Sequence, residues 1–99
     1  MSGINVLYFE SVTVADSSIG LNMPNGAKGA LLTLETAQIR WRADGTAPTS
    51  AVGHLMEVGD TLNFTSWEVP SANWKSVLRA IRFIRTTATS GVLRVTYFD

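Results

Sequence analysis

The 99-residue sequence contains no cysteine, which excludes a disulfide framework, a thiolate nucleophile and a cysteine-ligated zinc site. His54 is the single histidine, and no serine stands in the Gly-x-Ser-x-Gly pattern of a nucleophile turn. A catalytic triad or a metal site would need His54 to meet carboxylates, and these show no characteristic spacing. Glycine-rich nucleotide-binding motifs are absent as well. The sequence therefore predicts a protein that is not an enzyme and that holds no metal or cofactor.

Charged residues are also scarce, at 16% of the chain against about 25% in a usual domain. The eight basic and eight acidic side chains balance, and a net charge of zero argues against general nucleic-acid binding. The distribution is uneven, because Asp99 is the sole acid of the last 25 residues. Two interpretations stay open: complementary charge between neighbouring strands, or a basic face that meets an acidic partner. The basic residues of this segment are Lys75, Arg79, Arg82, Arg85 and Arg94.

Long apolar runs are missing, since no stretch approaches the roughly 20 apolar residues that a membrane span needs. The first residues lack the basic segment and apolar run of a signal peptide, so we expect a soluble protein made in the cytoplasm. The length leaves room for one domain, residues 1–99. Such a small domain buries only about 60–70% of the surface of its unfolded chain. With 45% hydrophobic residues, some apolar surface must remain outside, which favours an oligomer or a docked subunit.

The sequence does contain short alternating segments separated by turn residues. Within residues 37–64, Ile39 and Trp41 alternate with polar and basic neighbours, and Asp44-Gly45 supplies a turn. About seven or eight short strands, with turns about every 8–12 residues, predict an all-β fold: an antiparallel β-sandwich or jelly roll. The expected strands cover residues 6–15, 30–36, 39–41, 55–58, 61–65, 78–86 and 92–98. Further turn signals are Pro24-Asn25-Gly26, Gly59-Asp60 and Ala88-Thr89-Ser90-Gly91.

The first expected strand changes phase along its length. Leu7 and Phe9 share one face, whereas Val12 and Val14 share the other. A β-bulge near Glu10-Ser11, or coverage of both faces, would account for this change. We expect both pairs to be buried. The expected core comprises Leu7, Phe9, Val12, Val14, Leu32, Leu34, Ile39, Trp41, Leu62, Phe64, Ile81, Phe83, Leu93, Val95 and Tyr97.

Residues 66–76 form the least regular segment, which we interpret as a loop with room for one helical turn over residues 72–77 after Ser71. Trp67 and Trp74 lie in it. Three roles stay open for these rings: a lid folded back on the end of the barrel, an anchor at a protein interface, or a platform for sugar rings.

Arginine pairs on expected strands allow a similar choice. Arg40 and Arg42 share the outer face of one strand, and Arg79 and Arg85 share a face of another. Cross-strand pairing with Glu35 or Glu57 is the ordinary explanation, and an intersubunit salt bridge is the alternative. The candidate interface residues are Trp67, Trp74, Arg79, Arg82 and Arg85.

Several segments carry a family resemblance. Residues 39–49 read Ile-Arg-Trp-Arg-Ala-Asp-Gly-Thr-Ala-Pro-Thr, and residues 53–62, 80–85 and 93–98 follow them. Together they resemble the small β-sandwich proteins encoded among the head and tail genes of tailed bacteriophages. The Arg-x-Arg-x-Asp-Gly-Thr-x-Pro-Thr element and the closing Val-Thr-Tyr-Phe are the more specific parts. The resemblance covers residues 30–98.

This resemblance implies a non-enzymatic virion component that is made in the host cytoplasm and binds neither nucleic acid nor membrane. The first expectation is a decoration (cement) protein that binds the major capsid protein between subunits and stabilises the shell, as a trimer or dimer. A place in the tail or at the head–tail junction, among other virion proteins, is the alternative within the same class. From another class, a glycan-binding module would use Trp67 and Trp74.

Overall fold

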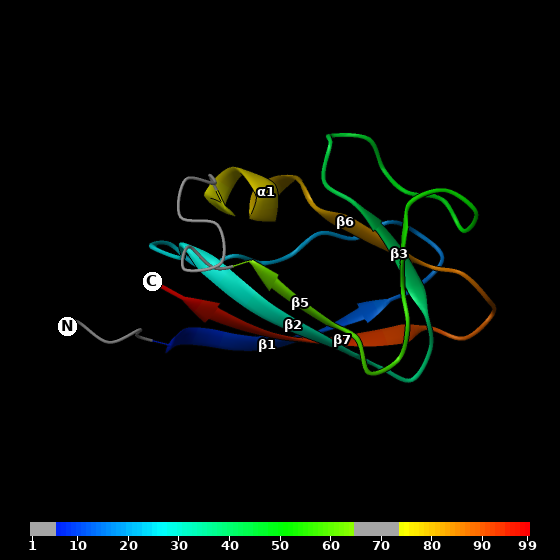
Figure 1. Cartoon of the computed structure of the whole chain (residues 1–99), viewed down its shortest axis with the longest axis horizontal. Coiled ribbons are helices and arrows are strands. Elements are labelled where there is room, and N and C mark those ends of the chain that lie inside the picture. The colour runs from blue at the N-terminus through cyan, green and yellow to red at the C-terminus, as the bar shows by residue number, and fades with distance from the viewer. Residues whose placement is uncertain (1–5, 65–73) are drawn as a thin grey trace.

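The computed structural model describes residues 6–64 and 74–99. Within these residues the chain forms seven strands and one short helix, arranged in two antiparallel sheets (Figure 1). The larger sheet has the strand order β1-β7-β2-β5, and the smaller has the order β4-β3-β6. The predicted all-β class is confirmed. The elements are β1 (Val6–Val14), β2 (Gly29–Glu35), β3 (Ile39–Arg42), β4 (His54–Met56), β5 (Thr61–Phe64), α1 (Trp74–Ala80), β6 (Arg82–Arg85) and β7 (Gly91–Phe98).

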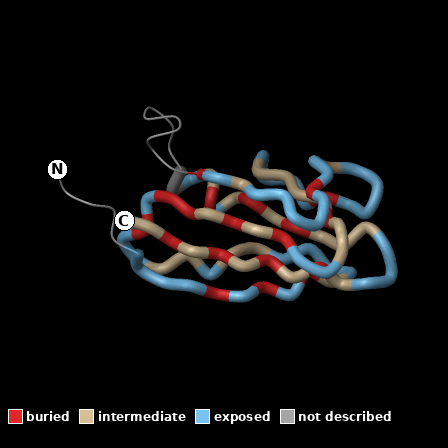
Figure 2. The backbone as a smooth tube through the Cα atoms, turned by 60° about the horizontal axis from the view of Figure 1, so that its bottom comes forward, coloured by how far each residue is buried: buried red, intermediate tan, exposed pale blue. Residues whose placement is uncertain are grey.

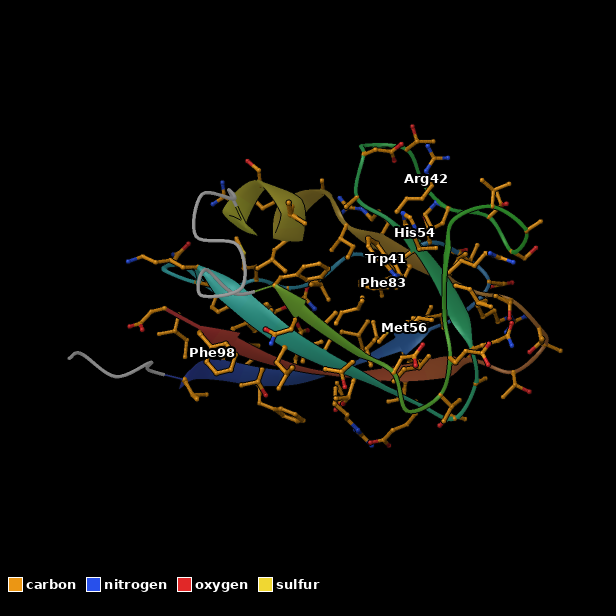
Figure 3. All side chains as sticks on the ribbon, in the orientation of Figure 1. Trp41, Arg42, His54, Met56, Phe83 and Phe98 are labelled. Carbon is orange, nitrogen blue, oxygen red and sulfur yellow. The ribbon has the colours of Figure 1, made fainter. Side chains whose placement is uncertain are left out.

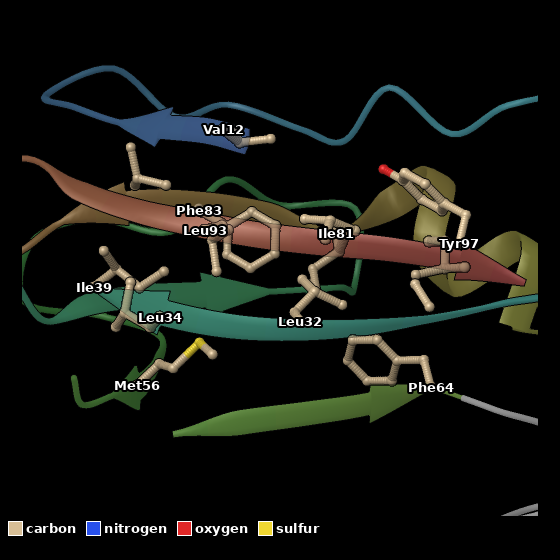
Figure 4. Close-up of a cluster of buried hydrophobic side chains, with 14 of the residues drawn as sticks. Val12, Leu32, Leu34, Ile39, Met56, Phe64, Ile81, Phe83, Leu93 and Tyr97 are labelled. Atoms are coloured by element: carbon tan, nitrogen blue, oxygen red, sulfur yellow. The ribbon is translucent and has the colours of Figure 1, made fainter. Parts of the chain in front are cut away.

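Both sheets contribute side chains to one hydrophobic core (Figure 4). In β7, burial alternates strictly along the strand, which places Leu93, Val95 and Tyr97 inside, as the period of a β-strand requires. Leu32 and Leu34 of β2 do the same. The predicted core is confirmed for these residues and for Val12, Val14, Ile39, Phe64, Ile81 and Phe83, and it gains Ala27, Ala30, Met56 and Leu78. Trp41 and Leu62 only pack against it, half-buried.

The predicted inward orientation of Leu7 and Phe9 is wrong, because both side chains are exposed. The inward positions of β1 are Val12, Val14 and, in phase with them, Glu10. The strand does contain an irregularity, but it lies between Val6 and Tyr8 rather than near Glu10-Ser11. Because the inward position 10 holds a glutamate, the apolar residues of β1 alone do not show which of its positions face the core.

The predicted strand over residues 78–86 is also wrong in its first part. Residues up to Ala80 belong to helix α1, and only Arg82–Arg85 form a strand. Leu78 and Ile81 are both buried, and a spacing of three residues places two side chains on the same side of a helical turn. The expected helical turn over residues 72–77 overlaps the start of α1, and Ser71 lies outside the described residues. No helix in the described part of the chain is long and apolar enough to cross a bilayer.

Tight turns connect the strands where the sequence predicts them. Ala27 N donates to Pro24 O at 3.3 Å, and Gly26 takes a φ of 87°.

The chain passes from β2 in one sheet to β3 in the other at Thr36, whose φ is 81°. Ala37 N donates to Glu35 O at 3.0 Å, so this crossing is a γ-turn with positive φ. A β-branched residue there is strained by about 1–3 kcal/mol.

Strand β6 of the smaller sheet contacts β1 of the larger sheet, and β4 precedes β5 along the chain. Residues 15–19, which follow β1, close the free edge of β6: Ile19 and Phe83 exchange backbone hydrogen bonds of 2.9 and 2.8 Å. Arg85 N also donates to Ala15 O at 3.0 Å. On the opposite side, a turn at Gly59 carries β4 directly into β5. The smaller sheet therefore has one edge covered by the chain itself.

Candidate functional site

Strand β1 forms an edge of the larger sheet, because its only strand partner there is β7. Its first four residues are apolar or aromatic and all exposed, with exposed fractions of 63% for Val6, 39% for Leu7, 47% for Tyr8 and 56% for Phe9. This exposed end is visible next to the N-terminus in Figure 2. The strand contains no lysine, arginine or proline; its protective features are the inward-pointing Glu10 and the irregularity between Val6 and Tyr8. We call Val6, Leu7, Tyr8 and Phe9 the β1 patch.

Tyr8 of the β1 patch stacks on the inward Tyr97, whereas Val6 and Phe9 continue the patch across the outer face of the sheet. The register places Phe9 beside Thr96 of β7 and then Leu31 of β2, and it places Val6 beside Phe98. Further along the outer face, toward Ser11 and Arg94, the exposed side chains are polar or charged. Arg94 pairs there with Glu35 at 3.2 Å and donates to Ser11 Oγ at 2.6 Å. The outer face therefore has an apolar end and a polar end.

A second apolar surface lies at β4, which is an edge of the smaller sheet and pairs only with β3. Leu55 of this strand is exposed, as are Val52 before it and Val58 after it. Because β4 runs into β5, this surface lies on the side of the molecule opposite β1. Contiguous exposed apolar residues of this kind mark contact surfaces more often than isolated ones do.

Glu10 anchors the loop of residues 19–23 from inside the fold. Its carboxylate is buried, with 8% exposed, and accepts hydrogen bonds from Asn22 N at 3.0 Å and Asn22 Nδ2 at 2.9 Å. The hydroxyl of the fully buried Tyr97 also donates to it. Burial, followed by the hydrogen bond to Glu10, raises the pKa of Tyr97 above its usual value. The ring of Tyr8 stacks on Tyr97, with centroids 6.1 Å apart.

The structure separates the basic residues that the sequence groups together. Arg79 in α1 and Arg82 in β6 line one cavity of about 340 Å³ with the loop of residues 19–23. Arg85 lines a different cavity with Asp16, and Arg94 belongs to the ion pair on the larger sheet. Arg79 and Arg85 do not share a strand face, because Arg79 is helical. The basic third of the chain is therefore not a single face.

The predicted pairing of Arg40 and Arg42 with acids of neighbouring strands is wrong. Arg40 donates to two carbonyls of the loop before β4, Ser50 O at 3.2 Å and Gly53 O at 2.9 Å. Arg42 forms a bidentate pair with Asp44 on its own strand end, with a shortest N–O distance of 2.5 Å. This hydrogen-bonded pair lowers the pKa of the Asp44 carboxyl and raises the pKa of Arg42.

His54 lies against aromatic rings rather than beside a nucleophile. Its ring centroid is 4.6 Å from that of Trp41, which in turn meets Phe64 edge-on at 6.0 Å. Figure 3 shows His54 and Trp41 next to each other on β4 and β3. Among the described residues, no group of three or more histidines and carboxylates is placed to hold a metal ion.

The candidate interface of the sequence is thus only partly brought together. Arg79 and Arg82 meet at one cavity, and Arg85 does not join them. Trp67 lies outside the described residues, as does the side chain of Trp74 at the start of α1. The β1 patch was missed, although four consecutive apolar residues in a strand are themselves a signal of surface that is not simply solvated. Comparisons with protein-family models, curated proteins and solved structures give no match for this chain.

Proposed function

We propose that this protein is a non-enzymatic structural subunit that docks on other protein surfaces through the β1 patch. One observation carries the proposal: an edge strand presents four consecutive exposed apolar residues with no lysine, arginine or proline among them. The chain does protect another edge, because residues 15–19 cover β6 with three backbone hydrogen bonds. In the described part of the chain, no hydrogen bond covers the outer edge of β1.

Covering the patch adds substantially to association, and further contacts of the partner must add to it to give a tight complex. Full burial of a Val, Leu or Phe side chain contributes about 1.5–3 kcal/mol relative to full exposure. The four side chains of the patch are about half exposed, so complete coverage contributes roughly 4 kcal/mol. Each 1.4 kcal/mol corresponds to a tenfold change in affinity, which makes the patch worth about a thousandfold. Backbone hydrogen bonds between the open edge of β1 and a strand of the partner would also fix the orientation of the partner.

In its most specific form, the proposal makes the protein a bacteriophage virion component. The support is the resemblance in residues 39–49 and 93–98, together with a small, weakly charged two-sheet domain that leaves an edge open. We place it first as a capsid decoration protein, with the major capsid protein as partner and with trimers or dimers as its state. A tail or head–tail junction component is the alternative within this class.

Copy number in purified particles from the source tests the virion proposal. Quantitative mass spectrometry against the major capsid protein should give a ratio near one copy per capsid subunit, or one per three. A handful of copies per particle would instead place the protein in the tail or at the head–tail junction. Absence from particles would overturn the virion proposal.

A pair of matched variants tests the docking surface itself. The double variant Leu7→Ser and Phe9→Ser should lower association by roughly thirtyfold, because it removes two of the four apolar contacts and with them about 2 kcal/mol. Leu55→Ser is the control, since it removes an exposed leucine from the other open edge strand. Association is read by sedimentation velocity of the purified protein and by its retention on particles. Equal effects of both changes, or no effect of the double variant, would contradict docking at β1.

A further inference from the structure

The cavity between the loop of residues 19–23 and the junction of α1 and β6 brings two guanidinium groups together. Arg79 and Arg82 line this space of about 340 Å³, and no acidic side chain of residues 6–64 or 76–99 lines it. Ile19, Leu21 and Met23 give it an apolar component. Two cations without an acid in one hollow are a site for a negatively charged group.

Arg82 is held in place before any ligand arrives. Its Nη1 donates to Arg79 O at 2.8 Å and to Ile81 O at 2.7 Å. The guanidinium also lies directly against Gly20, where a Cβ atom would come within 2.7 Å of Nη1 and 3.1 Å of Cζ. These bonds use only Nη1, so Nε and Nη2 keep their donors, and a fixed guanidinium loses little entropy when it binds.

Three other arginines of the described strands have partners within the chain, whereas the guanidinium of Arg85 has none among the described residues. Arg42 is paired with Asp44 and Arg94 with Glu35, while Arg40 donates to two loop carbonyls. The guanidinium of Arg79, in contrast, is exposed and forms no hydrogen bond or ion pair with the described residues. Arg40, Arg42 and Arg94 are thus satisfied within the chain, and Arg79 and Arg82 meet at this cavity with donors still open toward it.

The loop on the other side of the cavity is also fixed. Asn22 is bound through both its backbone and its side-chain amide to the buried Glu10. Ile19 is paired with Phe83 of β6. Both walls of the cavity are therefore held by contacts that do not depend on a ligand, which is the condition for a preformed site.

We propose that this cavity binds a carboxylate of an acidic protein segment. A guanidinium presents paired donors that match the two oxygens of a carboxylate. The apolar side chains of Ile19, Leu21 and Met23 suit the methylene groups of a glutamate, and a chain of zero net charge lacks the broad field that draws a nucleic acid. The site is distinct from the β1 patch and does not require it, so it extends beyond the docking function proposed above.

The direct test is a titration of the ¹⁵N-labelled protein with a short capped peptide of alternating glutamate and alanine, followed by NMR. We expect saturable shifts at the amides of residues 19–23 and at the Arg82 Nε–H. The same peptide with glutamine in place of glutamate should cause none. Inorganic phosphate and a single-stranded oligonucleotide are the competing probes. Tighter binding of either probe than of the glutamate peptide, or no saturable shift with that peptide, would overturn the proposal.

Three variants test whether the peptide binds at this cavity. Arg79→Gln should weaken peptide binding roughly tenfold, since it removes one charged partner of the carboxylate. Gly20→Ala should weaken it as well while the fold persists, because its Cβ displaces only the flexible end of Arg82. Arg42→Gln is the control: it removes the same charge at the position beside Arg82 in the register, but from a guanidinium that Asp44 already occupies. If Arg42→Gln and Arg79→Gln weaken peptide binding equally, the peptide responds only to the net charge of the protein, and the proposed site is wrong.

Discussion

Replacement of Glu10 by leucine tests how the fold tolerates a carboxylate in its interior. Glu10 accepts three hydrogen bonds from inside the fold, two from Asn22 and one from Tyr97. Leucine fills a similar volume without an acceptor, so the change isolates the loss of hydrogen bonding from the loss of packing. The buried hydroxyl of Tyr97 would then lose the acceptor of its proton, whereas the exposed Asn22 can turn to water.

The expected loss follows from these two contributions. A buried donor left without an acceptor costs about 1–3 kcal/mol, and each lost hydrogen bond from an exposed group contributes about 0.5–1.5 kcal/mol. The sum for Glu10→Leu is about 3 kcal/mol, out of the roughly 5–15 kcal/mol that stabilise a whole domain. At 4–8 °C per kcal/mol for a domain of this size, the melting temperature should fall by about 12–24 °C.

The assay is urea unfolding followed by tryptophan fluorescence and circular dichroism. Glu10→Gln should lose only about 1 kcal/mol, because the amide oxygen can still accept from Tyr97 while Asn22 adjusts at the surface. Glu10→Leu combined with Tyr97→Phe should recover most of the stability, since the double change removes the orphaned hydroxyl. A Glu10→Leu protein as stable as the original, or a double variant less stable than Glu10→Leu alone, would refute the reasoning.

Two further predictions concern the same interior. Gly91→Ala should lower the free energy of unfolding by about 2 kcal/mol in urea titrations, because the added Cβ would lie 2.7 Å from the backbone oxygen of Ala37 and from Cγ2 of Ile39; a stabilised variant would show that this close approach does not exist. Because burial raises the pKa of Tyr97 above 10.0, the unfolded chain releases that proton first as the pH rises. Stability should therefore fall above about pH 10 by up to 1.4 kcal/mol per pH unit, and Tyr97→Phe should reduce this slope; an unchanged slope would contradict it.

The sequence predicts the fold class and most of the core because alternation is undisturbed where inward positions are all apolar. Strand β7 is the clearest case, with Leu93, Val95 and Tyr97 inward as expected. In β1 a strict period of two, counted back from Val12, would have placed Glu10 inside and Phe9 outside. The prediction instead placed the apolar Leu7 and Phe9 inside. The hydrogen bonds that allow Glu10 to be buried come from Asn22 and Tyr97, which are distant in the sequence.

The second part of helix α1, Leu78 to Ala80, was assigned to a strand for a related reason. A helix of seven residues is too short to show several turns of periodicity, and short helices depend on tertiary packing rather than on propensity. Leu78 is fully buried and supplies that packing. The grouping of Arg79 with Arg82 at one cavity follows from this helix, so a continuous strand could not predict it.

The two proposed surfaces can be disturbed separately, which makes the two proposals fail independently. Leu7 and Phe9 are exposed on β1 and form none of the hydrogen bonds that hold the cavity loop. Serine at these positions should therefore leave binding of the glutamate peptide unchanged. Glu10→Leu releases Asn22 and with it the loop of residues 19–23, yet leaves Leu7 and Phe9 in place on the strand that β7 still pairs. That variant, assayed below its melting temperature, should lose peptide binding and keep association, because only the cavity depends on the position of Asn22.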